Sequence, residues 1–336
     1  MIKQYRIEKA IIEERYDSFS LAKANDRTLY HYAFFSANLH RFLPHIPWHE
    51  HARLFKEMAL NQSLSLLDMQ YATVFADNTL QTAVENLRDQ LQAQPGIVVT
   101  FHTGSYRLLN FLLSKAGVPI SLVISKHTYR KEGEAFREAF RKLGNGAGHF
   151  DLIVAEQPQA LLRMVRSLKD GNNLLLYMDG NTGMRARLNQ LEKISWFGKP
   201  LFVRRGVPYL AHAAQVPIYP VLSERGATGV DLRILSKIDP AGFVQRTAFI
   251  AETCQHLYAL LEAVLQKQPE QWTCWPYIHR NLGPSISGNL ISEPENQLSC
   301  WSVFKFGSDY CLFDKINYQF FMITREMYKD WVEKCL

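Results

Sequence analysis

Apolar residues change their spacing along the chain near residue 94, and this change divides the sequence into two patterns. Between residues 68 and 92, apolar side chains recur every three to six positions, at Val74, Leu80, Ala83, Leu87 and Leu91. Spacing of this kind is typical of helices with one buried face. Pro95 and Gly96 then interrupt the pattern. We therefore expect a helical cap region over residues 1–93.

Short apolar runs alternate with amphipathic segments beyond this break. The runs are GIVVTF (96–101), ISLVIS (120–125), DLIVA (151–155), NLLLYMD (173–179) and PIYPVLS (217–223). The segments between them, such as EGEAFREAFRKLG, have helical spacing and end near glycine or a polar break. Continuous apolar strands joined by helical crossovers predict an α/β core over residues 94–284, with a mostly parallel central sheet flanked by helices.

The end of the chain departs from this alternation. After a polar stretch with Gly and Pro that suits a linker, residues 296–336 contain three short aromatic runs broken by GSD and KIN, and then a helical segment. We expect a small C-terminal β-meander with a helix, which serves chiefly as a structural extension packed against the core. The alternative is a module that recognises a peptide or a carrier protein.

Composition narrows the class of protein. The chain has 336 residues, 47% of them apolar, and a formal net charge of +6. A basic protein suits an acidic partner, although lysine and arginine are dispersed and no RNA-binding signature is present, so nucleic-acid binding is disfavoured. The N-terminus is charged throughout, and no apolar run reaches the length of about 18 residues that a spanning helix needs. We expect a cytoplasmic protein, with peripheral contact to the inner membrane left open.

Three familiar kinds of site are disfavoured by the sequence. The five cysteines form no CxxC pair, which argues against a zinc ribbon or a disulfide framework. The HIPWHEH segment (45–51) groups three histidines but lacks HExxH, so no metal site is expected there. The chain contains no GxSxG motif, which weighs against a serine hydrolase of the usual α/β type.

Polar residues follow two of the expected strands, His102 after the first and Asp179 after the fourth. They belong to four ordered stretches, VVTFHTGSYRLL, GNNLLLYMDGN, WFGKPLFVRRGVPYLAHAAQVPIYPV and QPEQWTCWPYIHRNLG. Together these stretches resemble the bacterial lipid A acyltransferase family, the lauroyl and myristoyl transferases of the lysophospholipid acyltransferase superfamily, over roughly residues 90–283. The resemblance implies the α/β fold and direct transfer of an acyl group from a thioester to an acceptor, without a covalent enzyme intermediate.

The catalytic pair of that family is altered in this chain. In the family, a histidine acts as general base and an acidic residue five positions later orients it. His102 matches the histidine, but Arg107 stands at the acidic position, and a guanidinium cannot accept the imidazole N–H. Three interpretations follow: Asp179 supplies the orienting carboxylate, the acceptor is an amine that needs only a weaker base, or the protein is an inactive carrier- or lipid-binding scaffold.

The resemblance also suggests roles near the start of the expected helix that follows His102. The backbone N–H groups of Gly104 and Ser105 would face a thioester oxyanion, the alternative for Ser105 being a helix N-cap. For Arg107, where the chain departs from the family, the chemistry of the guanidinium suggests a role instead: a forked pair of hydrogen bonds to a substrate carboxylate or to the phosphate of a phosphopantetheine arm. The alternative is an outward-facing position.

The resemblance also places three later residues in the site. Asn181 belongs with Asp179 to the aspartate segment of the family, the alternative being a simple turn. Arg204 and Arg205 lie in the stretch that would contact the acceptor or phosphate groups, the alternative being a solvated surface.

These observations together predict an acyltransferase. The donor would be the phosphopantetheine thioester of an acyl or peptidyl carrier protein, or CoA, with no bound cofactor; carrier proteins are acidic, which suits the basic chain. Because the membrane-anchoring helix of the lipid A family is missing, a soluble or carrier-bound acceptor is expected more than a long glycolipid embedded in the bilayer. The acceptor amine or hydroxyl would belong to a small molecule, a peptide or a lipid. The alternatives are a thioesterase and an inactive scaffold. An enclosed cavity beside His102 would favour transfer, whereas a cleft filled by Arg107 would favour the scaffold.

Overall fold

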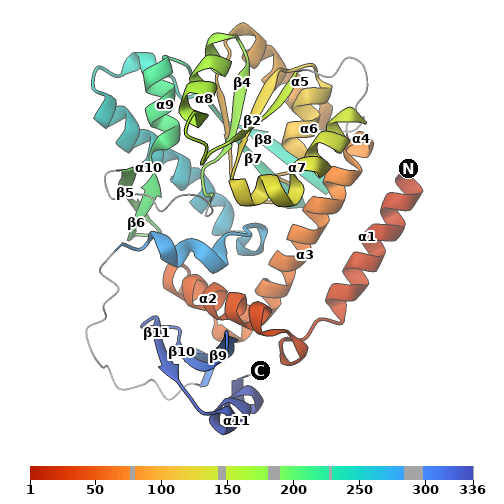
Figure 1. Cartoon of the computed structure of the whole chain (residues 1–336), viewed down its shortest axis with the longest axis vertical. Helices are drawn as coiled ribbons and strands as arrows, with labels where there is room; N and C mark the ends of the chain where they lie inside the picture. Colours follow the sequence, from red (N-terminus) through yellow and green to blue (C-terminus); the bar gives the residue numbers. More distant parts are fainter. Residues whose placement is uncertain (76–79, 143–148, 181–189, 227–228, 284–297, 336) are drawn as a thin grey trace.

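The structure is a computed structural model that describes residues 1–75, 80–142, 149–180, 190–226, 229–283 and 298–335 (Figure 1). Its N-terminal region is helical, as the sequence predicts, and contains α1 (Ile2–Asp17), α2 (Asp26–Phe42), α3 (His51–Gln70), α4 (Ala72–Phe75) and α5 (Leu80–Ala93). The helical pattern expected over residues 68–92 is thus divided among three helices. Within α5 the buried stripe includes Val84, while Ala83 is half-buried. No helix in the described ranges is long and apolar enough to cross a membrane.

The centre of the fold is a six-stranded sheet with the strand order β3-β2-β4-β1-β7-β8. Its strands are β1 (Ile97–Thr100), β2 (Ile120–Ile124), β3 (Phe150–Val154), β4 (Asn173–Tyr177), β7 (Ile218–Gly226) and β8 (Gly229–Ile234). The first five strands in this order are parallel, and β8 returns antiparallel to β7. The mostly parallel sheet and its flanking helices confirm the predicted fold class.

Helices cover both faces of this sheet, as Figure 1 shows. One face packs against α8 (Ala160–Lys169), α9 (Gly206–Ala214) and α10 (Arg246–Leu265), and the other against α5, α6 (Leu108–Lys115) and α7 (Lys126–Arg141). Successive side chains of a strand point to opposite faces, so Ile97 and Val99 join the first apolar layer and Val98 joins the second. The strands are buried on both faces, which explains their continuous apolar sequence.

A hairpin outside the sheet was not predicted. Strands β5 (Leu191–Trp196) and β6 (Lys199–Arg204) pair antiparallel around Phe197 and Gly198. Both turn residues have positive φ, 48° and 70°. Positive φ at both central positions defines a type I′ hairpin turn, which usually has Asn, Asp or Gly there. Phenylalanine is rare in such turns, so the sequence lacks the ordinary hairpin signal.

The C-terminal segment forms the predicted three-stranded antiparallel meander with a helix. It consists of β9 (Trp301–Phe306), β10 (Asp309–Asp314), β11 (Gln319–Met322) and α11 (Arg325–Cys335). The meander packs on α2, through a cluster in which Phe34 of α2 meets Phe304 and Phe313. The C-terminal extension therefore attaches to the N-terminal helices, away from the central sheet (Figure 1). The linker expected before it lies largely outside the described residues.

One lysine of this extension is buried against α2. Lys315 is 3% exposed, and its ammonium donates to Ser36 Oγ at 3.3 Å and lies 4.7 Å from the ring centre of Trp48. Burial lowers the pKa of Lys315 from 10.5 to about 8. The charged form of Lys315 therefore destabilises the folded protein below pH 8. This destabilisation disappears as pH rises from 8 to 10.5, the pKa in the unfolded chain.

We expect Lys315→Met to flatten the pH dependence of stability. The native protein should gain up to about 3 kcal/mol in free energy of unfolding between pH 8 and 10.5, because about 1.4 kcal/mol accompanies each pKa unit. The variant should lack this gain. At pH 7 its free energy of unfolding should exceed that of the native protein, by an amount that the loss of the contacts to Ser36 and Trp48 reduces. Urea unfolding at several pH values measures both effects, with Lys329→Met on the exposed face of α11 as control. An unchanged slope in Lys315→Met would contradict the prediction.

Candidate active site

His102 and Asp179 meet at the carboxyl edge of the sheet. β1 and β4 are parallel neighbours, and Thr100 pairs with Tyr177 at their ends. Since His102 and Asp179 each follow this pair by two residues, the chain brings both side chains to the same level. His102 Nδ1 lies 2.7 Å from Asp179 Oδ1, and the His102 backbone N–H donates to Asp179 Oδ2 at 2.9 Å. The contact required by the first of the three interpretations, in which Asp179 orients His102, is therefore present.

The surroundings of Asp179 hold its carboxylate ionised. Its side chain is 2% exposed, and Oδ2 also accepts a hydrogen bond from Trp272 Nε1 at 2.5 Å. Burial raises the pKa of this carboxyl group, but the neighbouring His102 and the three hydrogen bonds outweigh burial, so the pKa is lowered overall. An ionised carboxylate accepts the proton on Nδ1 of the imidazole. Nε2 of neutral His102 is then left to accept a proton.

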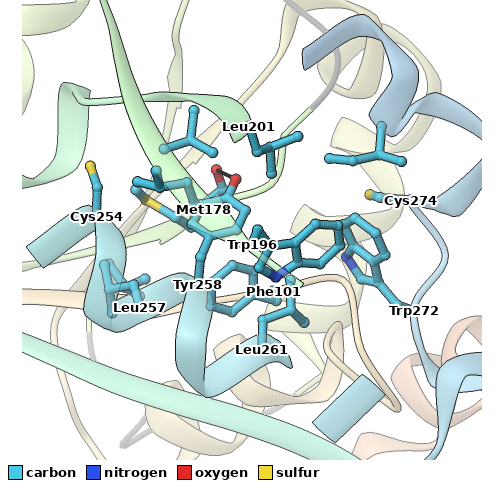
Figure 2. Close-up of a cluster of buried hydrophobic side chains, with 14 of the residues drawn as sticks. Phe101, Met178, Trp196, Leu201, Cys254, Leu257, Tyr258, Leu261, Trp272 and Cys274 are labelled. Carbon is cyan, nitrogen blue, oxygen red and sulfur yellow. Dashed lines mark hydrogen bonds between the residues drawn. The ribbon is translucent and has the colours of Figure 1, made fainter. Parts of the chain in front are cut away.

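A buried aromatic cluster supports the segments that carry the pair. Figure 2 shows Phe101 and Met178, which immediately precede His102 and Asp179, among the rings of Trp196, Tyr258 and Trp272. The hydroxyl of Tyr258 donates to the backbone oxygen of Met178 at 3.4 Å, and the rings of Trp196 and Trp272 have centres 5.5 Å apart. Close packing at these positions restricts the backbone on either side of the pair.

A cavity of about 530 Å³ opens beside His102, whose side chain is 25% exposed. Its walls come from β2, β4, α7, α8 and α9, and most of them are apolar. The apolar lining residues include Val123, Ile124, Phe136, Leu161, Met164, Leu176, Met178, Val207 and Leu210. Polar groups enter the wall at Ser125, Thr128, Glu132, Gln190 and Arg204. The arrangement places a general-base candidate at one side of a mainly apolar space.

Arg107 lies in the wall of this cavity and does not fill it. Its guanidinium stacks on the ring of Tyr106, 4.6 Å from the ring centre, and Nε donates to Glu132 Oε2 at 3.4 Å. The ring of Tyr106 also contacts the imidazole of His102, with centres 4.7 Å apart. The outward-facing alternative for Arg107 is therefore wrong. Arg107 takes no part in the hydrogen bonds that orient His102, which come from Asp179 instead.

The structure does not support the expected oxyanion role of Gly104 and Ser105. The Gly104 N–H donates to the carbonyl of Gln271 at 3.1 Å, and the Ser105 N–H donates to Ser223 Oγ at 3.0 Å. Gly104 has φ of 51°, and a side chain there would lie 2.6 Å from the Ser223 carbonyl oxygen, so its close approach to β7 explains the glycine. Neither residue lines the cavity.

Ser105 is also not the N-cap of the following helix. That helix begins at Leu108 with Arg107 as its N-cap residue, two positions after Ser105. The Ser105 hydroxyl instead donates to the buried carboxylate of Asp68, which also pairs with Arg225. Ser105 therefore belongs to a structural network that joins α3 to β7.

The other predicted site residues have different positions. Arg204, at the end of β6, lines the cavity. Arg205 does not line it and is the N-cap residue of α9. Asn181 lies outside the described residues, so its predicted role stays a prediction.

Cys274 is a neighbour of the pair that the sequence gave no reason to single out. The segment around it runs beside residues 102–103, where the Thr273 N–H donates to the His102 carbonyl at 3.1 Å. Ligand atoms of Cys274, His102 and Asp179 lie within 4.8 Å of one another, which makes them the candidate group for a metal among the described residues. The 2.7 Å separation of His102 Nδ1 and Asp179 Oδ1 is that of a hydrogen bond. It is shorter than the spacing of two atoms bound to one tetrahedral zinc, about 3.3 Å from the usual bond lengths.

The histidines of the HIPWHEH segment do not gather into a site. His51 is fully buried, and its ring nitrogens contact Ser36 Oγ at 2.8 Å and the Ile46 carbonyl at 3.3 Å. Burial lowers the pKa of His51 to about 3. His49 lies at the surface beside Glu50.

Comparisons with known proteins supply no family for this chain: no protein-family model matches the sequence, and no curated protein matches it either.

Proposed function

We propose that this protein is an acyltransferase that moves an acyl group from a thioester directly to an amine or hydroxyl acceptor. The observation that carries the proposal is the His102–Asp179 pair beside a mainly apolar cavity. His102 Nε2 removes the proton of the acceptor as the acceptor attacks the thioester carbonyl, and the carboxylate of Asp179 stabilises the imidazolium that forms. The C–S bond breaks, the donor leaves as a thiolate, and the imidazolium of His102 returns the proton to it.

The cavity supports transfer rather than a purely structural role. Its volume of about 530 Å³ lies within the range of small-molecule sites, and its apolar wall suits an acyl chain. A scaffold would be favoured if Arg107 filled the cleft, but the guanidinium lies against Tyr106 in the wall. The resemblance to the lipid A acyltransferases agrees with this assignment, with Asp179 in place of the acidic residue five positions after the histidine.

The donor in this proposal is a phosphopantetheine thioester, on an acyl or peptidyl carrier protein or on CoA. The net charge of +6 suits the acidic surface of a carrier protein. The acceptor is a small molecule, a peptide or a lipid. The cytoplasm and the periphery of the inner membrane are the proposed locations.

The proposal is tested with the full chain and a panel of acyl-loaded carrier proteins and acyl-CoA, incubated with and without a mixture of amines and alcohols. Mass spectrometry of the carriers and of the small molecules measures loss of the acyl group and its appearance on an acceptor. We expect the donor to be unloaded only when an acceptor is present. Equal unloading without acceptor would replace transferase by thioesterase, and no unloading of any donor would favour the scaffold.

A further inference from the structure

Arg107 carries a buried donor that nothing in the described part of the chain uses. Its side chain is 11% exposed, and Nη1 has no hydrogen-bond partner among the described residues. Glu132 accepts a hydrogen bond from Nε at 3.4 Å, and Nε is a different nitrogen of the guanidinium. A buried donor on a charged group is costly when it is left without an acceptor. An oxygen of a bound ligand would satisfy it, and Arg107 is one of the residues that line the cavity.

The position of Arg107 limits which ligand oxygen this is. Both the guanidinium and the imidazole of His102 contact the ring of Tyr106, at 4.6 Å and 4.7 Å from its centre. The guanidinium carbon and the centre of the imidazole ring therefore lie at most about 9 Å apart, a span much shorter than a pantetheine arm. The phosphate of a phosphopantetheine donor is separated from its thioester by the whole pantetheine arm, with two amide bonds. An anion this close to the reacting atoms therefore belongs to the acceptor.

We infer that the acceptor is an α-amino acid or a similar amine with a carboxylate one or two carbons from its nitrogen. This inference rests on the proposed acyl transfer. Arg107 binds the carboxylate and His102 Nε2 faces the neutral amine. The amine nitrogen attacks the thioester carbonyl, a C–N bond forms and the C–S bond breaks. The amine proton passes to His102 and then to the leaving thiolate, so the products are an N-acyl amino acid and a free thiol.

Matched acceptors test this assignment. Glycine, leucine and phenylalanine are each compared with their primary amides, which keep the amine and lose the negative charge, using octanoyl, dodecanoyl and hexadecanoyl thioesters. We expect the native protein to prefer the carboxylate form by about 10- to 100-fold in kcat/KM, the range of a hydrogen bond between charged groups. Arg107→Gln should bring this ratio close to one. Arg137→Gln, on the exposed face of α7, should keep the native ratio.

Two further measurements separate this inference from the proposed function. Calorimetry measures the binding of N-dodecanoyl-leucine and N-dodecanoyl-leucinamide without any turnover. If the native protein bound the carboxylate form more tightly and Arg107→Gln did not, the inference would be supported even if no transfer occurred. The second measurement tests whether Arg107 binds the phosphate of the donor. It compares phosphopantetheine thioesters, which carry the phosphate, with N-acetylcysteamine thioesters, which lack it. If Arg107→Gln changed the discrimination between these donors and left the acceptor ratio unchanged, the anion would be on the donor and the inference would fall.

The remaining outcomes are also decisive. Transfer to amides as fast as to amino acids by the native protein would overturn the inference and leave the acyltransferase proposal intact. Loss of Arg107 leaves Glu132 without its partner, so the Arg107→Gln, Glu132→Gln double variant is measured beside the single one. A native ratio in a folded double variant would also overturn the inference.

Discussion

Replacing His102 with glutamine is expected to lower acceptor-dependent acyl transfer by about 100- to 10,000-fold in kcat, the usual contribution of a general base. Glutamine keeps a polar side chain of similar size, but its amide cannot take a proton near neutral pH. The loss should appear in kcat more than in KM, because the proton moves only during the chemical step. Single-turnover measurement of the acylated product gives this rate directly.

His256→Gln is the matched control for this variant. His256 lies on the exposed side of α10, outside the cavity, and its replacement should leave the rate unchanged. If folded His102→Gln retained more than about a tenth of the native rate, the general-base role would be wrong, because a loss below tenfold is smaller than this catalysis supplies.

Replacing Asp179 with asparagine is expected to lower kcat by about 100- to 10,000-fold, the effect of losing the group that orients and charges a catalytic histidine. The carboxylate accepts from three donors, the ring and backbone N–H groups of His102 and the indole N–H of Trp272. An amide replaces one accepting oxygen with a donating NH₂ group. Whichever way it is turned, at least one of these donors loses its acceptor. The imidazolium also loses its negative neighbour.

The same change should destabilise the fold in a pH-dependent way. Losing one acceptor to a buried donor costs about 1–3 kcal/mol. The pKa of Asp179 is depressed in the folded state, so its carboxylate stabilises the protein above the unfolded value of 3.8, and this stability is lost as pH falls through the folded value. The difference in free energy of unfolding between native protein and Asp179→Asn should therefore be largest near pH 7 and shrink in acid.

Unfolding curves at several pH values and rates at a temperature where both proteins are folded separate the two effects. Asp151→Asn is the control for loss of an ordinary carboxylate. Asp151 lies on β3, is partly exposed and pairs with Arg163 of α8. Native kcat in folded Asp179→Asn would show that this carboxylate does not assist His102.

Local signals in the sequence were sufficient for the main elements of the fold. Strands such as β1 and β4 are buried on both faces over most of their length, so most of their residues are apolar and the strands are recognisable without any partner. The position of His102 and Asp179 at two strand ends was also readable, because parallel strands end at one edge of a sheet. The sequence thus determined the α/β class and two of the residues of the candidate site.

Tertiary structure decided how that site is completed. Trp272 is 93 positions from Asp179, and its indole N–H reaches the carboxylate only because a short segment after α10 runs beside residues 102–103. In the same segment, the carbonyl of Gln271 accepts a hydrogen bond from the Gly104 N–H, the group that the sequence suggested would face an oxyanion. A motif gives the spacing of residues along the chain, but the partner of each N–H group depends on which distant segment packs against it. For this reason the sequence identified the histidine and its carboxylate, and only the folded chain showed which donors remain for a ligand.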